Sequence, residues 1–250
     1  MYDQLGFDEF SDQAAFEDAD TLRGLTTDRA TYDYVLDLLE SDERPQFVFD
    51  VTLQNHGGYD WDGDGYFDKR IYLTGEEQDK YPTVDQYLSL VRYSDDAVQE
   101  LISYFSKVDE PTAIVFFGDH QPGFSDWLFE ATHGSAADDL GLEAVQERYT
   151  VPYLIWANDA ARAQGAHAPD SGANGSLNYL GSKLVEAAGL PTSGYQRFLL
   201  AVREAVPAIN LNGFLTADGA WHGFGDEDGG DPGALDALRA YATVQYDNLF

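Results

Sequence analysis

The chain has 250 residues, of which 44% are hydrophobic and 14% aromatic, so it can form a packed core and is not a wholly disordered protein. Its 45 acidic residues far outnumber the 14 basic ones, and a formal net charge of -31 excludes nucleic acid and an anionic membrane surface as partners. Cysteine is absent, which excludes disulfides, thiolate metal sites and a cysteine nucleophile.

A helix and a strand are the first elements that the pattern predicts. Residues 1–24 are acidic with interspersed Phe and Leu, which favours loops and short turns. Thr27 is the expected N-cap of a helix that runs to about residue 40, because apolar residues recur at helical spacing after it. Residues 47–54, FVFDVTLQ, are β-branched and aromatic and predict a strand that ends at the turn signal of residues 55–58.

The middle of the chain predicts a long helix and two more strands. Thr83 and Gln86 form a capping-box pattern, and apolar residues at helical spacing then predict an amphipathic helix over 84–107. Residues 112–117, TAIVFF, and 151–157, VPYLIWA, are nearly continuous apolar runs, which are typical of strands buried on both faces of a parallel sheet. This alternation of strands and helices predicts an α/β fold with a mostly parallel sheet between helices.

The last third of the chain predicts helices around a glycine-rich segment. Helical patterns run over residues 176–188 and 232–248, and the Gly- and Asp-rich residues 210–233 contain two apolar patches that favour a hairpin. We therefore divide the chain into an α/β core of residues 1–165 and a small C-terminal subdomain of helices and a hairpin, residues 166–250.

An acid and a histidine follow the apolar strand of residues 112–117. Asp119 and His120 come directly after Gly118, which permits an irregular backbone. Functional groups of open α/β sheets collect beyond the carboxyl ends of strands, and a carboxylate with an imidazole suits Zn²⁺, Mn²⁺ or Mg²⁺. Two ligands do not close a metal site, so others must come from elsewhere. The pattern alone also fits a turn cap at Asp119 and a merely exposed His120.

Four further polar residues are candidates for the same site. Asn55 and His56 follow the strand of residues 47–54, although a histidine in such a place is most often a hydrogen-bonded loop residue. Gln121 adjoins the Asp119–His120 pair and is a candidate for substrate contact. His133 follows the pair in sequence and is a candidate to reach the same cleft.

A second group of carboxylates lies in the segment DWDGDGYFD, residues 60–68. Its acidic residues alternate and are followed by a glycine, as in calcium-binding loops. Position 12 of such a loop is Ile71, so the bidentate glutamate is missing. Two interpretations stay open, a weak structural Ca²⁺ site and a solvated acidic hairpin tip. The candidate calcium ligands are Asp60, Asp62, Asp64, Tyr66 and Asp68.

Five segments, taken in this order, resemble one family. They are FVFDVTLQNHGGYD, YLSLVRYSDDAVQELISYF, AIVFFGDHQPG, YTVPYLIWAND and SLNYLGSKLVEAAGLP. The chain resembles, from about Tyr2 to its end, the extracellular catalytic domain of lipoteichoic acid synthase-like proteins. These form the phosphoglycerol transferase branch of the sulfatase and alkaline phosphatase superfamily. The resemblance implies a mostly parallel sheet between helices, followed by a smaller subdomain.

The resemblance also implies a chemistry and roles for the candidates. Asp119 and His120 would be metal ligands, and His56 would lie at the substrate phosphate or leaving group. A threonine nucleophile would attack phosphorus while a divalent cation (Mn²⁺, Mg²⁺ or Zn²⁺) holds the reacting oxygens. The implied substrates are phosphodiesters or sulfate esters of glycerolipids, glycans or polymers. Asn55, Gln121 and His133 stay candidate substrate contacts because of their positions in the sequence.

One departure from the family changes the expectation for this chain. In the family, the nucleophilic threonine and one acidic metal ligand precede the segment that corresponds to Tyr2. We therefore expect a soluble fragment that turns over no substrate. The full-length protein would be held by an N-terminal membrane anchor on the extracellular face of the bacterial cell membrane. The alternative is a non-catalytic, cation-stabilised remnant that binds a polymer or a protein partner.

Overall fold

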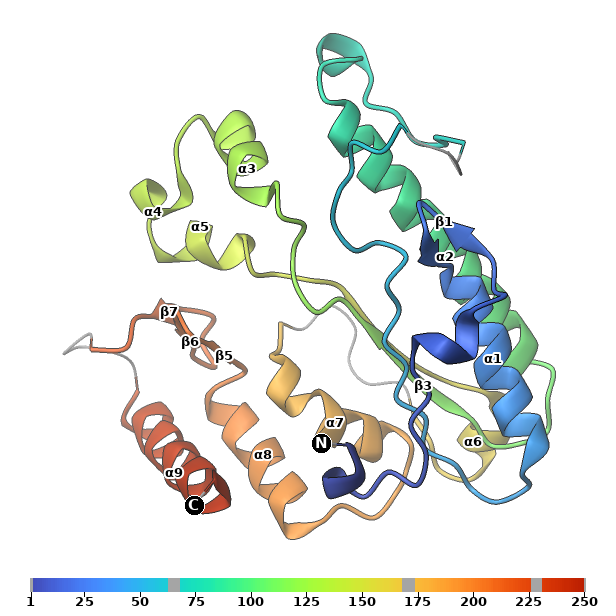
Figure 1. Cartoon of the computed structure of the whole chain (residues 1–250). Coiled ribbons are helices and arrows are strands. Elements are labelled where there is room, and N and C mark those ends of the chain that lie inside the picture. Colours follow the sequence, from blue (N-terminus) through green and yellow to red (C-terminus); the bar gives the residue numbers. More distant parts are fainter. Residues whose placement is uncertain (1, 63–67, 168–173, 226–230, 250) are drawn as a thin grey trace. The chain divides into compact units, whose positions relative to one another are not determined.

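The computed structural model divides the chain into two compact units, Met1–Lys107 and Val108–Phe250 (Figure 1). The sequence-based division after residue 165 differs from this boundary and stays a proposal. The structure describes four stretches of the chain: residues 2–62, 68–167, 174–225 and 231–249.

Two helices, α1 (Asp28–Ser41) and α2 (Pro82–Phe105), pack together in the first unit. α1 begins where the sequence predicts, because the Thr27 hydroxyl accepts a hydrogen bond from the Ala30 N–H at 3.1 Å. The long helix is confirmed, but the capping box predicted to start it is wrong. Pro82 occupies its first turn, and the Gln86 side chain instead exchanges two hydrogen bonds with the backbone of Trp61.

Short elements complete the first unit. A two-stranded antiparallel hairpin, formed by β1 (Thr21–Leu22) and β2 (Leu25–Thr26), precedes α1. Among the described residues of this unit, the remaining elements are three 3₁₀ helices: η1 (Tyr2–Leu5), η2 (Gln13–Phe16) and η3 (Gly75–Glu77).

Residues 47–54 do not form a strand, so this prediction is wrong for the structure described. A strand needs a neighbour to take up its backbone N–H and C=O groups, and β-propensity alone does not supply one. No described strand pairs with this segment. The side chains of Phe47, Val51 and Leu53 are exposed.

Both apolar runs of the second unit are strands, as predicted. They are β3 (Ala113–Phe117) and β4 (Tyr153–Ala157), and Val115 lies opposite Ile155. Their pairing is antiparallel, and so is every other strand pair in the described stretches. The mostly parallel sheet is therefore wrong for these strands. A continuous apolar run reports burial, but it carries no information on strand direction.

Helices connect and cover these two strands. α7 (Leu177–Ala187) packs on β3 (Figure 1), where Leu180 and Ala187 join Ile155 in a small buried cluster. Four shorter helices complete this region: α3 (Ser125–His133), α4 (Ala137–Leu140), α5 (Leu142–Glu147) and α6 (Asp159–Ala163).

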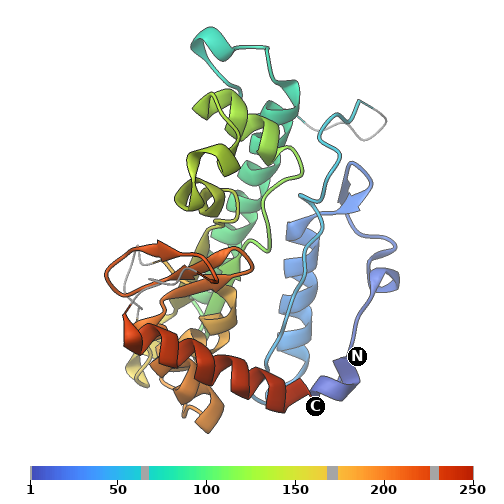
Figure 2. The same ribbon diagram turned by 90° about the vertical axis from the view of Figure 1, so that its left-hand side faces the viewer.

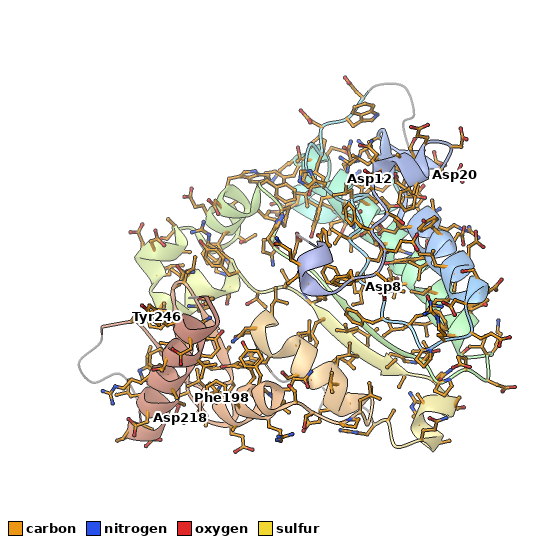
Figure 3. All side chains as sticks on the ribbon, turned by 60° about the horizontal axis from the view of Figure 1, so that its bottom comes forward. Asp8, Asp12, Asp20, Phe198, Asp218 and Tyr246 are labelled. Atoms are coloured by element: carbon orange, nitrogen blue, oxygen red, sulfur yellow. The ribbon has the colours of Figure 1, made fainter. Side chains whose placement is uncertain are left out.

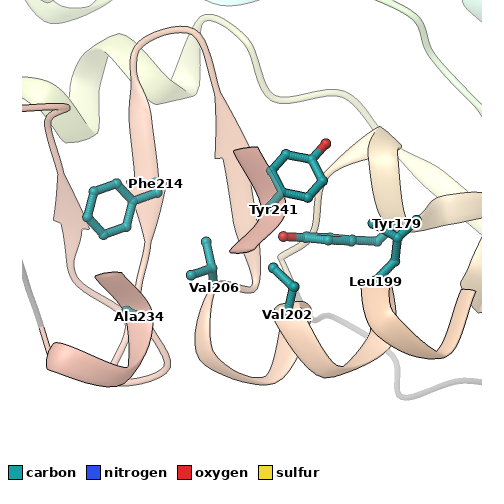
Figure 4. Packing of buried hydrophobic residues seen from close by; sticks show 7 residues of the cluster. All are labelled: Tyr179, Leu199, Val202, Val206, Phe214, Ala234 and Tyr241. Carbon is teal, nitrogen blue, oxygen red and sulfur yellow. The ribbon is translucent and has the colours of Figure 1, made fainter. Parts of the chain in front are cut away.

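The larger core of the second unit lies among its last elements. Two helices, α8 (Gly194–Ala205) and α9 (Pro232–Leu249), pack on each other beside a three-stranded antiparallel sheet, which contains the predicted hairpin (Figure 2). The strands are β5 (Ala208–Asn210), β6 (Gly213–Leu215) and β7 (Trp221–His222). Seven buried side chains from these helices, the sheet, α7 and the C-cap of α8 form the core (Figure 4): Tyr179, Leu199, Val202, Val206, Phe214, Ala234 and Tyr241.

The acidic excess lies on the surface. Carboxylates such as Asp8, Asp12 and Asp20 of the first unit and Asp218 of the second are exposed (Figure 3). This agrees with a solvated acidic shell. Among the helices that the structure describes, none combines the length and the apolar character needed to cross a membrane.

Candidate active site

His56 lies in a tight turn, residues 54–58, of the first unit. Its backbone N–H donates to the carbonyl oxygen of Leu53 at 3.0 Å, and Gly58 takes a positive φ of 79°. The imidazole is exposed to solvent. The turn therefore presents the His56 imidazole to solvent, where a substrate can reach it.

Arg23 holds the backbone of this turn. Its side chain is 6% exposed, and Nη2 donates to the carbonyl oxygens of Gln54 and His56 at 2.8 and 2.9 Å. Nη1 donates to the carbonyl oxygens of Gly57 and Gly58 at 3.3 and 2.6 Å. This contact was not predicted from the sequence. The sequence feature that could have indicated it is an arginine followed by a glycine between two short β-prone segments.

A buried polar network supports the turn from its other side. The carboxylate of Asp28 accepts a hydrogen bond from the Ser94 hydroxyl of α2, and Ser94 Oγ accepts one from Asn55 Nδ2 at 2.8 Å. Gln54 joins the network, since its Oε1 accepts from the Asp28 N–H at 3.2 Å. The predicted substrate contact Asn55 thus has a structural partner, and its role toward substrate stays a prediction.

Two carboxyl groups in this region have perturbed acidity. Burial raises the pKa of Asp28, although the Ser94 hydroxyl opposes the shift. Packing around the carboxyl group and the charge of Asp28 raise the pKa of Asp50 to about 6, even though Asp50 stands on exposed chain. Burial, together with the charges of Asp28 and Asp50, raises the pKa of Tyr32. Burial near the His56 turn therefore disfavours the charged form of both carboxyl groups.

The raised pKa of Asp50 predicts that the first unit is more stable at mildly acidic pH than at neutral pH. The pKa of Asp50 is about 6 in the folded state and roughly 4 in the unfolded chain, so the folded state binds this proton more tightly. The resulting contribution to the free energy of unfolding is fully present below about pH 4 and is lost as the pH rises through 6. Asp50→Asn should stabilise the protein at about pH 7.5 by roughly 1 kcal/mol, a value reduced because solvent reaches this group. Urea unfolding at about pH 5.5 and 7.5 measures both effects.

The control is Asp37→Asn, an exposed position on α1 that relieves the same unit of negative charge. It should leave the pH dependence between these two values as in the parent. An Asp50→Asn variant that keeps the parent's full pH dependence would contradict the assignment.

Asp119 and His120 follow β3 in the second unit, and both side chains are exposed. Asp119 Oδ1 accepts from the His120 N–H at 2.9 Å, while Oδ2 lies 3.5 Å from His120 Nε2. His120 Nδ1 lies 2.8 Å from the carbonyl oxygen of Gln121. A carbonyl only accepts, so Nδ1 carries the proton in this hydrogen bond. The neutral ring then has its lone pair on Nε2, facing the carboxylate.

This geometry fits a shared cation. Two ligands held roughly 2.0–2.2 Å from one ion lie about 3.0–3.6 Å apart, and the Nε2–Oδ2 separation falls in this range. The same contacts also fit the other interpretation of the sequence, a local cap with an exposed histidine. Within the described stretches, no three His, Asp or Glu side chains are grouped closely enough to hold a metal ion.

Gly118 brings the strand end close to its neighbour. Its N–H donates to the carbonyl oxygen of Pro152 at 3.1 Å, which continues the β3–β4 pairing. A Cβ at this position would lie 3.2 Å from Cβ of Val151. Close approach, and not the irregular backbone expected from the sequence, accounts for glycine here.

The two other candidate residues of this unit, Gln121 and His133, each contact neighbouring residues. Gln121 Nε2 donates to the carbonyl oxygen of Thr150, which fastens the segment after the Asp119–His120 pair. His133 stacks on Phe129 of α3, with ring centroids 3.9 Å apart, and its Nε2 lies 3.5 Å from a carboxylate oxygen of Glu147. Both residues have structural roles, and their contact with substrate stays a prediction.

The acidic loop is described only at its two ends. Asp60, Asp62 and Asp68 are exposed, while the proposed calcium ligands Asp64 and Tyr66 lie outside the described residues. The chain beyond the loop is fastened to α2, where the Ser89 hydroxyl oxygen accepts from the Arg70 N–H at 3.0 Å. Calcium binding stays a prediction.

Three relatives cover this chain in part or in full. It is 26% identical over 265 residues to a protein of Rhizobium meliloti (strain 1021) whose name refers to cyclic beta-1,2-glucan modification, an alignment that covers 100% of this chain and 38% of that protein. It is 27% identical over 232 residues to lipoteichoic acid synthase-like YvgJ of Bacillus subtilis (strain 168), covering 87% of this chain and 35% of YvgJ. The capsular polysaccharide biosynthesis protein RkpI of R. meliloti is 31% identical over 122 residues, which are 47% of this chain and 20% of RkpI.

The chain thus spans well under half the length of these relatives. No solved structure matches it. The sulfatase family profile matches residues 1–190, which contain the His56 turn and the Asp119–His120 pair. The resemblance drawn from the sequence is confirmed, and this α/β chain belongs to the sulfatase family.

Proposed function

We propose that this chain is part of a metal-dependent enzyme that transfers or hydrolyses phosphodiesters or sulfate esters, in the manner of a phosphoglycerol transferase. The Asp119–His120 pair carries the proposal, because its facing Oδ2 and Nε2 atoms offer two ligands to one cation. Mn²⁺, Mg²⁺ and Zn²⁺ all accept such ligands. Two relatives are named for a glycan and a polysaccharide, and a third for lipoteichoic acid. We therefore propose a glycerolipid, glycan or envelope polymer as substrate, met on the extracellular face of the cell membrane.

The candidate residues would have different roles in the reaction. Asp119 Oδ2 and His120 Nε2 would hold the ion, which supplies Lewis acidity toward the phosphoryl or sulfuryl oxygens. His56 would donate a proton to the departing alkoxide oxygen, as a general acid exposed on a fixed turn. The chain's -31 charge repels an anionic ester, so local neutralisation at the site is required for binding.

The first test measures metal binding by the 250-residue chain. Asp119→Asn and His120→Gln should each weaken Mn²⁺ and Zn²⁺ binding by more than about tenfold, a loss that even substitutions outside the ligand set cause. Asp139→Asn and His167→Gln are matched controls in the same unit, since both residues are exposed. Unchanged metal affinity in the two site variants, measured by calorimetric titration, would reject the metal site.

The second test asks whether the bound ion meets a phosphate ester. The ³¹P signal of glycerol 1-phosphate should broaden with the Mn²⁺-loaded chain beyond the broadening that free Mn²⁺ causes, because paramagnetic relaxation requires phosphorus near the ion. Asp119→Asn should reduce the broadening to the level of free Mn²⁺. Reversal by sulfate would favour a site that also takes sulfate esters. Binding of Mn²⁺ without excess broadening would favour a remnant that binds a cation but no ester.

A further inference from the structure

We propose that Arg23 is the positioning residue of His56, which it holds in place by binding the carbonyl groups of residues 54–58. The proposal rests on the function proposed above for His56. Its geometry lies wholly within the first unit.

The backbone at Arg23 is unusual for an arginine. Arg23 and Gly24 form the two-residue loop of the β1–β2 hairpin, in which Leu22 pairs with Leu25. Their φ angles are +56° and +76°, as in the primed turns that such hairpins use. Asn and Gly are the residues favoured there, and a long side chain with positive φ is strained. Strain of this kind persists where the side chain is needed, which points to the guanidinium group.

The guanidinium group uses both terminal nitrogens on one turn. Nη1 and Nη2 together donate to four backbone carbonyls, those of Gln54, His56, Gly57 and Gly58. The fifth carbonyl, that of Asn55, accepts from the Tyr59 hydroxyl at 2.8 Å. Every carbonyl from residue 54 to residue 58 is therefore bonded. Four carbonyl oxygens of one turn thus converge on a single guanidinium group, which ties them together.

The arrangement leaves His56 few degrees of freedom. Its N–H is bonded to Leu53 and its carbonyl to Arg23, so only the two side-chain torsions remain for aiming the imidazole. Asn55 is fastened to Ser94 in the same turn. A group that transfers a proton must be held within a fraction of an ångström of its productive position, and buried hydrogen bonds behind it supply that control.

Substitutions at Arg23 can separate positioning from folding. Arg23→Asn and Arg23→Gly remove the guanidinium and suit positive φ better than arginine does, so the hairpin should be retained. Arg23→Lys keeps the charge but has no fork that reaches four carbonyls. Arg44→Asn is the control, since Arg44 is exposed and lies outside the helices of the same unit.

The test is NMR relaxation of the 250-residue chain, with no substrate or activity needed. Arg23→Asn and Arg23→Gly should lower the order parameters of residues 55–58 and broaden the His56 ring signal, while the α1 and α2 amides stay as in the parent. Millimolar guanidinium should restore the turn in Arg23→Gly, and equal NaCl should not. A turn that stays ordered in both variants, or loss of the α1 and α2 signals along with it, would overturn the proposal.

A different result would contradict the proposed function. If the turn loosens in Arg23→Asn but Asp119→Asn leaves metal binding intact, Arg23 still positions His56 and the proposed metal chemistry is wrong. If metal binding and phosphate broadening behave as proposed but the turn stays ordered, only the role of Arg23 is wrong.

Discussion

Replacing Asn158 with alanine should lower the free energy of unfolding of the second unit by about 3 kcal/mol, because three buried or partly buried hydrogen bonds to backbone groups are lost at roughly 1 kcal/mol each. Asn158 is 2% exposed and follows β4 directly. Its Oδ1 accepts from the N–H groups of Thr112 and Ala161 at 3.0 and 2.9 Å. Its Nδ2 donates to the carbonyl oxygen of Glu110 at 2.7 Å. One side chain therefore caps α6 and fastens the chain that enters β3.

Hydrogen exchange of the β3 and β4 amides in increasing urea measures this effect on the second unit alone. Asn174→Ala is the matched control, because Asn174 is an exposed asparagine of the same unit and its loss should be nearly neutral. Asn158→Asp keeps acceptors for Thr112 and Ala161 but turns an oxygen toward the Glu110 carbonyl, so its stability should fall between those of the parent and Asn158→Ala. Equal exchange in the parent and Asn158→Ala would show that the three groups find other partners.

Elements whose pattern depends on near neighbours could be predicted from the sequence. The Thr27 cap and the long helix α2 are examples, because capping and helical periodicity are set by residues three or four apart. The strands β3 and β4 were predicted from their apolar runs, but their relative direction was not. Direction depends on the path of the 35 residues between them, residues 118–152, which apolar content does not encode.

The same distinction holds for the candidate site. Asp119 and His120 are adjacent in sequence, so their proximity could be predicted from the spacing alone. Arg23 and the His56 turn are more than thirty residues apart, and the contact joins a guanidinium to backbone carbonyls. Any residue supplies a carbonyl, so no side-chain pattern in the turn signals an arginine partner. Contacts of this kind are found from coordinates.

The segment of residues 47–54 shows how propensity differs from pairing. Its β-branched and aromatic residues satisfy the strand pattern, yet the segment has no ladder partner among the described strands. Strand propensity measures how well side chains fit a pleated, half-buried surface, and that surface is made by neighbours. A single sequence gives the preference, and the neighbours decide whether it is realised.

Gly213→Ala should destabilise the second unit by about 3 kcal/mol, at the upper end of overpacking costs, because its Cβ would meet backbone and not a movable side chain. Gly213 begins β6, with a φ of +157°. A Cβ there would lie 2.3 Å from the carbonyl oxygen of His222 in the neighbouring strand β7. That oxygen cannot move away without disturbing the β6–β7 pairing, in which Phe214 lies opposite His222.

Gly219→Ala separates this clash from backbone strain. Gly219 also has a positive φ, +86°, and a Cβ there would meet nothing within 4 Å. Its substitution should cost only about 1 kcal/mol, the penalty of a side chain in left-handed backbone. Thermal unfolding of both variants beside the parent gives the comparison. If the two alanines cost the same, the steric argument at Gly213 fails. If Gly213→Ala costs more and also weakens the exchange protection of β6 and β7, the close approach of the two strands limits the stability of this sheet.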